Sequence, residues 1–167
     1  MRKVFLPAAL ACALVVVSAL AQNKQSLVGT WKIDIAQSDF GSDPTPKSAT
    51  LIILKDTPKM ASYRLVIVDD KGKSSAYSWS GPQDGSTHPF MENGKNVSKE
   101  SQKRAEDGSL LIHSEDPDGT LNDVRSRVSD DGNTITDEAT MRSKDGKETK
   151  QKWIYRRVSE KKGGGAA

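Results

Sequence analysis

The sequence predicts an all-β protein, an antiparallel up-and-down meander of about eight or nine strands. Glycine follows Asp or Asn at regular intervals, and no window shows the sustained period of an amphipathic helix. Because glycine readily adopts the positive φ of tight hairpin turns, this pattern is typical of a meander, barrel or sandwich. The turns expected are Asp70-Lys71-Gly72, Asp84-Gly85, Asn93-Gly94, Asp107-Gly108, Asp118-Gly119, Asp131-Gly132 and Asp145-Gly146.

The first expected strand, residues 27–35, places Trp31, Ile33 and Ile35 on one face and Lys32 and Asp34 on the other. The next two are apolar on both faces, which favours central or well-covered positions. A long loop is expected over residues 81–92. The strands expected after the first are 48–55, 63–68, 74–80, 97–104, 110–114, 121–128, 134–141 and 147–158.

The second half of the chain is much more polar than the first. In the segment 121–128, Val124, Ser126 and Val128 share one face, and the opposite face carries Asp123 and two arginines. Two interpretations are open. The barrel has a filled core and a very polar outer face, or it has a partly polar lumen that accepts a ligand.

The N-terminal segment has the composition of a secretory signal peptide. Arg2 and Lys3 precede an apolar run, and Ala19-Leu20-Ala21 forms a small-residue cleavage site. We expect residues 1–21 to be removed after Ala21, residues 22–158 to form a single domain, and the glycine-rich residues 159–167 to be disordered. The protein is then secreted or periplasmic, without stable membrane insertion; an uncleaved N-terminal anchor is the alternative.

Composition excludes several classes of site. The chain's one cysteine, Cys12, lies in the leader, so the expected domain has no disulfide, thiolate nucleophile or cysteine-ligated metal. Loss of Arg2 and Lys3 reduces the 25 basic residues to 23, against 22 acidic ones. Such a balanced domain has no electrostatic footprint for nucleic acid. His88 and His113 stand in no metal-binding or catalytic motif, so we expect no catalytic residue, metal or cofactor, and no enzyme activity.

Two short motifs resemble those of the calycin superfamily, which includes the lipocalins and fatty-acid-binding proteins. Gly29-Thr30-Trp31-Lys32 is similar to the superfamily's first strand, and Tyr155-Arg156-Arg157 to its closing strand. The chain also resembles small secreted lipocalin-like proteins of bacteria. The resemblance implies a closed barrel with Trp31 at one end, beside Gly29 and an arginine. Strand periodicity places Arg157 on the face of Tyr155, with Arg156 as the alternative.

The resemblance implies a barrel that binds a small apolar or amphiphilic molecule. The order Tyr-Arg-Arg departs from the carboxylate-binding Arg-x-Tyr of fatty-acid-binding proteins, so that site is not carried over. The alternative is a filled-core module that acts at the cell surface through its loops and binds no small molecule. Candidate ligand-binding residues are Tyr63, Tyr77, Trp79, His88, Phe90, Trp153 and Tyr155, with the mouth expected near Trp79 and the loop 81–92.

Overall fold

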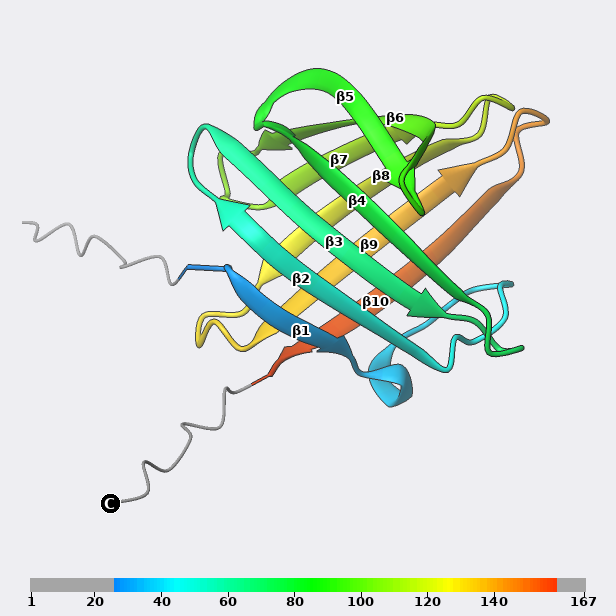
Figure 1. Ribbon diagram of the computed structural model, residues 1–167, viewed down its shortest axis with the longest axis horizontal. Helices are drawn as coiled ribbons and strands as arrows, with labels where there is room; N and C mark the ends of the chain where they lie inside the picture. Colours follow the sequence, from blue (N-terminus) through cyan, green and yellow to red (C-terminus); the bar gives the residue numbers. More distant parts are fainter. Residues whose placement is uncertain (1–25, 159–167) are drawn as a thin grey trace, which may run out of the picture.

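A computed structural model describes residues 26–158, which form a closed antiparallel β-barrel of ten strands (Figure 1). The expected signal peptide and C-terminal tail lie outside these residues. Within them, the helical structure is a single 3₁₀ turn, η1 (Ile35–Gln37). The strands are β1 (Gly29–Ile33), β2 (Ser48–Asp56), β3 (Met60–Val68), β4 (Ser74–Pro82), β5 (Asp84–Glu92), β6 (Lys95–Arg104), β7 (Leu110–Glu115), β8 (Leu121–Val128), β9 (Thr134–Arg142) and β10 (Glu148–Arg157).

Each strand pairs with the next along the chain, and β1 also pairs with β10, which closes the barrel. The prediction of an antiparallel meander with almost no helix is therefore confirmed. The strand count is corrected from eight or nine to ten, because residues 84–92 form strand β5 rather than a loop.

Strand β5 was missed because it lacks the apolar alternation that indicates a strand. Its ladder with β6, from Asp84↔Lys103 to Glu92↔Lys95, holds it by main-chain pairing instead. Asp84-Gly85 lies at the start of this strand, at the centre of the wide connection between β4 and β5, and forms no tight turn. β5 pairs with β4 at only two positions and curves away from it (Figure 1). The wall is therefore thinly paired between β4 and β5.

The other predicted turns do form hairpins, and the one between β6 and β7 shows their geometry. The Ala105 N–H donates to the Ser109 carbonyl, and the Gly108 N–H donates to the Ala105 carbonyl, both at 2.9 Å. The Asp107 carboxylate accepts the Ser109 hydroxyl and main-chain N–H. These hydrogen bonds lower the pKa of Asp107, and similar bonds lower the pKa of the turn residues Asp118, Asp131 and Asp145.

The buried core gathers on the side of the barrel formed by β1 and its neighbours. Trp31 is fully buried and packs with Ala49, Ile135 and Tyr155. Inward-facing aliphatic residues of β2 and β3 surround this cluster. The strands that form the other side carry few buried apolar residues, and the cavity lies against them.

Candidate ligand-binding cavity

One end of the barrel, here termed the Trp31 end, is held by an arginine that stacks on the tryptophan. Trp31 on β1 faces Arg157 on β10, and the guanidinium carbon of Arg157 lies 4.2 Å from the indole centroid. The same guanidinium donates to the carbonyls of Ser26, Val28 and Gly132. It thereby ties the incoming chain and the β8–β9 turn to the last strand.

Gly29 leaves room for this arginine. A Cβ atom at Gly29 would lie 3.3 Å from the Arg157 guanidinium, and its φ of 142° is one that other residues rarely adopt. Arg156, the alternative partner, points to the exposed face, where it bonds Asp34, Gln37 and Thr134. The structure thus places Arg157, not Arg156, over Trp31.

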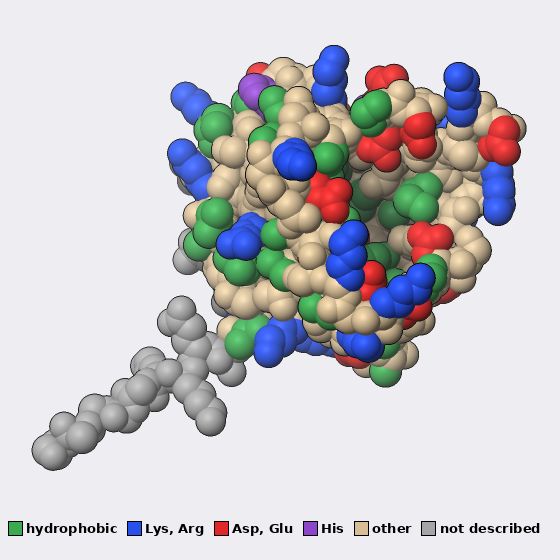
Figure 2. All heavy atoms as spheres, turned by 45° about the vertical axis from the view of Figure 1, so that its right-hand side comes forward, with side chains coloured by type: hydrophobic (Ala, Val, Ile, Leu, Met, Phe, Trp, Pro, Cys, Tyr) green, Lys and Arg blue, Asp and Glu red, His purple; other side chains and the backbone are tan. Residues whose placement is uncertain are grey.

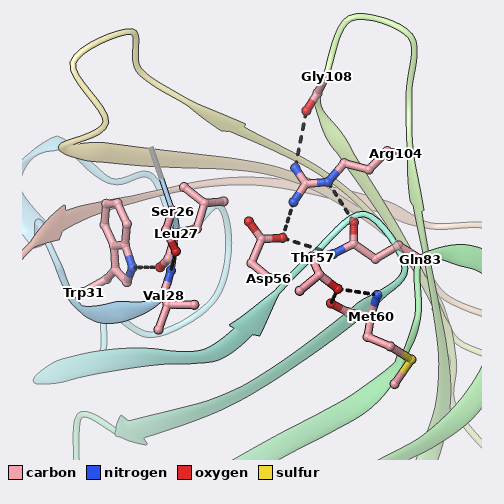
Figure 3. Close-up of polar contacts among 10 residues, drawn as sticks. All are labelled: Ser26, Leu27, Val28, Trp31, Asp56, Thr57, Met60, Gln83, Arg104 and Gly108. Carbon is pink, nitrogen blue, oxygen red and sulfur yellow. Dashed lines mark hydrogen bonds and ion pairs between the residues drawn. The ribbon is translucent and has the colours of Figure 1, made fainter. Parts of the chain in front are cut away.

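A second polar cluster lies at the Trp31 end, across the barrel from the tryptophan (Figure 3). The Arg104 guanidinium donates to the Asp56 carboxylate, to the Gln83 side-chain oxygen at 2.8 Å and to the Gly108 carbonyl. Gln83 in turn donates to Asp56. These bonds connect the ends of β2 and β6 with the β4–β5 connection. They also give Arg104 an ion pair with Asp56.

The lumen is not filled by side chains. It contains a cavity of about 310 Å³, and Figure 2 shows the barrel hollowed, with hydrophobic side chains inside and charged ones around the rim. The cavity runs from Gln83 and Arg104 to Asp116 and Thr120 beside the β7–β8 turn. Its apolar wall is formed chiefly by Leu27, Leu51, Ile53, Leu65, Phe90, Leu110, Ile112, Val124, Val128, Ile135 and Met141.

Glu100 is the most enclosed acid of the lumen, with 3% of its surface exposed. The Tyr63 hydroxyl donates to its carboxylate at 2.8 Å, and the Gln102 amide donates at 2.9 Å. Burial raises the pKa of Glu100 to about 7, although both hydrogen bonds favour its charged form. Glu100 therefore takes up a proton close to neutral pH.

Asp137 on β9 is a second lumen acid. Burial raises its pKa to about 6, and the Ser126 side chain opposite it on β8 offsets part of that effect. Burial also raises the pKa of Tyr63 and of Tyr155, and the charge of Asp137 raises both further. Since Tyr63 responds to Glu100 as well, both carboxyl groups act on the same part of the lumen.

Three buried polar atoms that line the cavity have no hydrogen-bond partner among the described residues: Gln102 Oε1, Asn122 Oδ1 and Asp137 Oδ1. All three are oxygen atoms that accept hydrogen bonds. Gln102 is 1% exposed. Its amide nitrogen donates to Glu100, whereas its oxygen accepts no hydrogen bond from any described residue. A buried acceptor without a donor costs about 1–3 kcal/mol of stability.

The aromatic residues predicted to bind a ligand separate into two groups. Tyr63, Phe90 and Tyr155 line the cavity. Tyr77 stacks on Phe90, and Trp153 packs edge-on against Phe40 and beside Tyr155. Neither Tyr77 nor Trp153 lines the cavity.

Trp79 and His88 also lie away from the cavity, and the segment expected to form its mouth is a strand. Trp79 is buried and donates from its indole nitrogen to the Glu100 carbonyl at 3.1 Å, which bridges β4 to β6 where β5 curves away. His88 lies edge-on against Trp79. Both residues thus reinforce the thinly paired part of the wall.

The sequence interpretation did not select the polar lining residues Glu100, Gln102, Asn122 and Asp137. The sequence pattern that could have indicated them is the alternation of inward-facing and outward-facing polar residues along a strand. In β6, the buried residues Ser98, Glu100 and Gln102 alternate with lysines and a serine that face outward. A strand with polar residues on both faces indicates either an exposed edge or a polar lumen, and here it lines the lumen.

The described residues contain no group of three or more His, Cys, Asp or Glu arranged to hold a metal ion. Within residues 26–158, no helix is long and apolar enough to cross a membrane. His113 is paired with Asp123 at 2.7 Å, but both side chains are half exposed on the outer face of the barrel. The chemistry that this cavity offers is an apolar wall combined with hydrogen-bond acceptors.

No protein-family model and no curated protein matches the sequence. The fold is similar to the crystal structure of a mutant of the fluorescent protein UnaG, with a TM-score of 0.53 and 16% identity over 80% of this chain and 96% of that chain. A de novo designed fluorescence-activating β-barrel matches with a TM-score of 0.42 and 15% identity, over 78% and 93% of the two chains. The likeness to UnaG concerns the fold alone.

Proposed function

We propose that this protein is a lipocalin-like barrel that binds a small apolar or amphiphilic molecule in its lumen, and that it does so as a secreted or periplasmic protein without enzyme activity. The observation that carries the proposal is the cavity of about 310 Å³ with a mainly apolar wall. Ligand sites in proteins typically combine such walls with a few placed polar groups. The composition of residues 1–21 supports export.

The size of the cavity limits the ligand. A cavity of about 150 Å³ accepts a benzene ring, so about twice that volume accommodates roughly a dozen non-hydrogen atoms. The proposed ligand is therefore a short-chain or single-ring amphiphile. Leu51, Leu65 and Val128 would contact its apolar part.

Fluorescence titration of the purified protein with 2-naphthol, a probe small enough for the cavity, tests binding, and native mass spectrometry of the same protein tests for a co-purified ligand. Val124 lines the cavity, so Val124→Trp should fill it and weaken 2-naphthol binding about tenfold or more. Leu111→Trp, on the exposed outer face of β7, is the matched control and should leave binding unchanged. Circular dichroism establishes that both variants are folded. Absence of 2-naphthol binding, or equal binding by all three proteins, would reject the proposal.

Export is tested separately. The mass of the protein recovered from the periplasm or medium of its host should correspond to a chain that begins at Gln22. Recovery of the full-length chain in the membrane fraction would support the uncleaved anchor instead.

A further inference from the structure

The lumen has an excess of acid. Its lining includes the carboxyl groups of Asp56, Glu100, Asp116 and Asp137 and two basic side chains, Lys55 and Arg104. Lys55 is exposed, and Arg104 is already paired with Asp56. Among the described residues, no basic side chain forms an ion pair with Glu100 or Asp137. A cationic group that entered the cavity would therefore meet two carboxyl groups without a counter-ion.

The lining atoms that lack a hydrogen-bond partner also favour a cationic donor over an anionic ligand. Gln102 Oε1, Asn122 Oδ1 and Asp137 Oδ1 can accept hydrogen bonds and have no donor within the described chain. Gln102 and Glu100 are almost completely buried, so these acceptors belong to a built site and not to a solvated surface. A carboxylate-ended ligand would add another acceptor and another negative charge, whereas an ammonium group supplies several N–H donors and a positive charge.

We propose that the barrel selects small amphiphiles with a hydrogen-bond-donating cationic end, of the primary amine class, with the unpartnered carboxylate oxygen of Asp137 as the acceptor of that end. The apolar body of the amine would lie against the aliphatic wall of β2, β3 and β8. This inference rests on the proposed function and specifies the ligand class of the same cavity. It predicts selectivity opposite to that of a barrel that binds fatty acids.

Displacement of 2-naphthol by decylamine, decanol, decanoic acid and decyltrimethylammonium tests the proposal at about pH 8, where both lumen acids are ionised. The four probes share one chain and differ in charge and donors. Decylamine should bind about tenfold or more tightly than decanol, since a hydrogen bond to a charged group contributes about that factor. Decanoic acid should bind more weakly than decanol. Decyltrimethylammonium, a cation without N–H donors, should bind more weakly than decylamine.

Two isosteric substitutions assign the preference to the lumen. Asp137→Asn should reduce the ratio of decylamine to decanol affinity about tenfold. Glu138→Gln is the matched control, because Glu138 is the next residue of β9 and pairs with Arg127 on the outer face. It should leave the ratio unchanged.

The outcomes separate this inference from the proposed function. If decanol and 2-naphthol bind but decanoic acid matches or exceeds decylamine, the amine preference is wrong and the binding function stands. Equal binding of decylamine and decyltrimethylammonium would remove the role of the unpartnered Asp137 oxygen and overturn the assignment. Failure of all four probes and of 2-naphthol would reject the binding function and this inference together.

Discussion

At the Trp31 end, the Arg157 guanidinium donates to three main-chain carbonyls, whereas in the lumen Gln102, Asn122 and Asp137 each retain a buried oxygen that has no donor among residues 26–158. The first arrangement stabilises the fold, because the charged group is stacked on Trp31 and its donors are satisfied. The second opposes folding, because each unsatisfied buried group costs about 1–3 kcal/mol.

This difference separates structural polar groups from functional ones. A domain with a typical stability of about 5–15 kcal/mol tolerates few such costs. The aspartates of the hairpin turns belong with the structural groups, because local N–H and hydroxyl donors lower the pKa of Asp107 and Asp131. Burial instead raises the pKa of Glu100 and Asp137. Burial thus disfavours the ionised form of the lumen acids, and a bound donor would stabilise that form.

The largest expected effect is at the Trp31 end. Trp31→Ala removes a fully buried indole, the ring beneath Arg157 and the hydrogen bond from its Nε1 to the Leu27 carbonyl. It should lower the free energy of unfolding by about 3–5 kcal/mol, measured by urea denaturation with circular dichroism. The same truncation at the half-buried Trp153 should cost less. Equal losses at the two positions would mean that Trp31 has no special role in closing the barrel.

The lumen should respond in the opposite direction. With a pKa near 6, Asp137 binds a proton more readily in the folded than in the unfolded chain, so the stability it contributes falls as pH rises from about 4 to about 7. Asp137→Asn should therefore raise the free energy of unfolding at about pH 8 by up to about 3 kcal/mol, with little change at about pH 4. Urea denaturation at both pH values measures this.

Glu138→Gln on the exposed side of the same strand should change stability by less than about 1 kcal/mol at either pH. A destabilised Asp137→Asn protein at about pH 8 would show that the Asp137 carboxylate is satisfied in the fold, as the Arg157 guanidinium is at the Trp31 end.

Ligand affinity should depend on pH through the same acids. Between about pH 8 and pH 5, Glu100 and Asp137 take up protons, whereas Tyr63 and Tyr155 remain neutral because their pKa values lie above 10. Decylamine affinity should fall about tenfold over this range, equivalent to about 1.4 kcal/mol, while decanol affinity stays constant. Displacement of 2-naphthol at each pH measures both. A parallel fall for decanol would indicate a general loss of binding rather than titration of the lumen.

The smallest effect concerns the geometry of the arginine. Arg157→Lys keeps the positive charge but loses the planar fork that reaches Ser26, Val28 and Gly132. It should lower the midpoint of urea denaturation by an amount equivalent to about 1 kcal/mol. Arg156→Lys is the control on the exposed face and should cost less than half as much. Equal losses of stability in the two variants would mean that the contacts of Arg157 with Trp31 and the three carbonyls stabilise the fold no more than the exposed contacts of Arg156 do.

The sequence was most informative where local chemistry determines structure. Glycine after Asp or Asn predicted the hairpins because the turn itself requires positive φ, as at Gly108 and Gly119. The alternation of the last strand placed Arg157 on the face of Tyr155 and left Arg156 as the alternative, and in the structure Arg157 is the arginine that stacks on Trp31. Both inferences depend on neighbours in the chain and not on the packing of distant strands.

The sequence was least informative where polarity had two possible meanings. Residues 97–104 have polar residues on both faces, and only the closed ladder shows that Glu100 and Gln102 point inward. Asp137 was hidden among the threonines and acids of β9 for the same reason. Strand β5 was missed because its pairing with β6 is a long-range main-chain property that its side chains do not record.

The contact between Arg157 and Ser26 also brings the two ends of the described domain together at one end of the barrel (Figure 1). A domain whose ends meet is suited to circular permutation, because a short peptide can join them without crossing the barrel. New termini opened at Asp145-Gly146, in the exposed β9–β10 hairpin, would keep each strand intact.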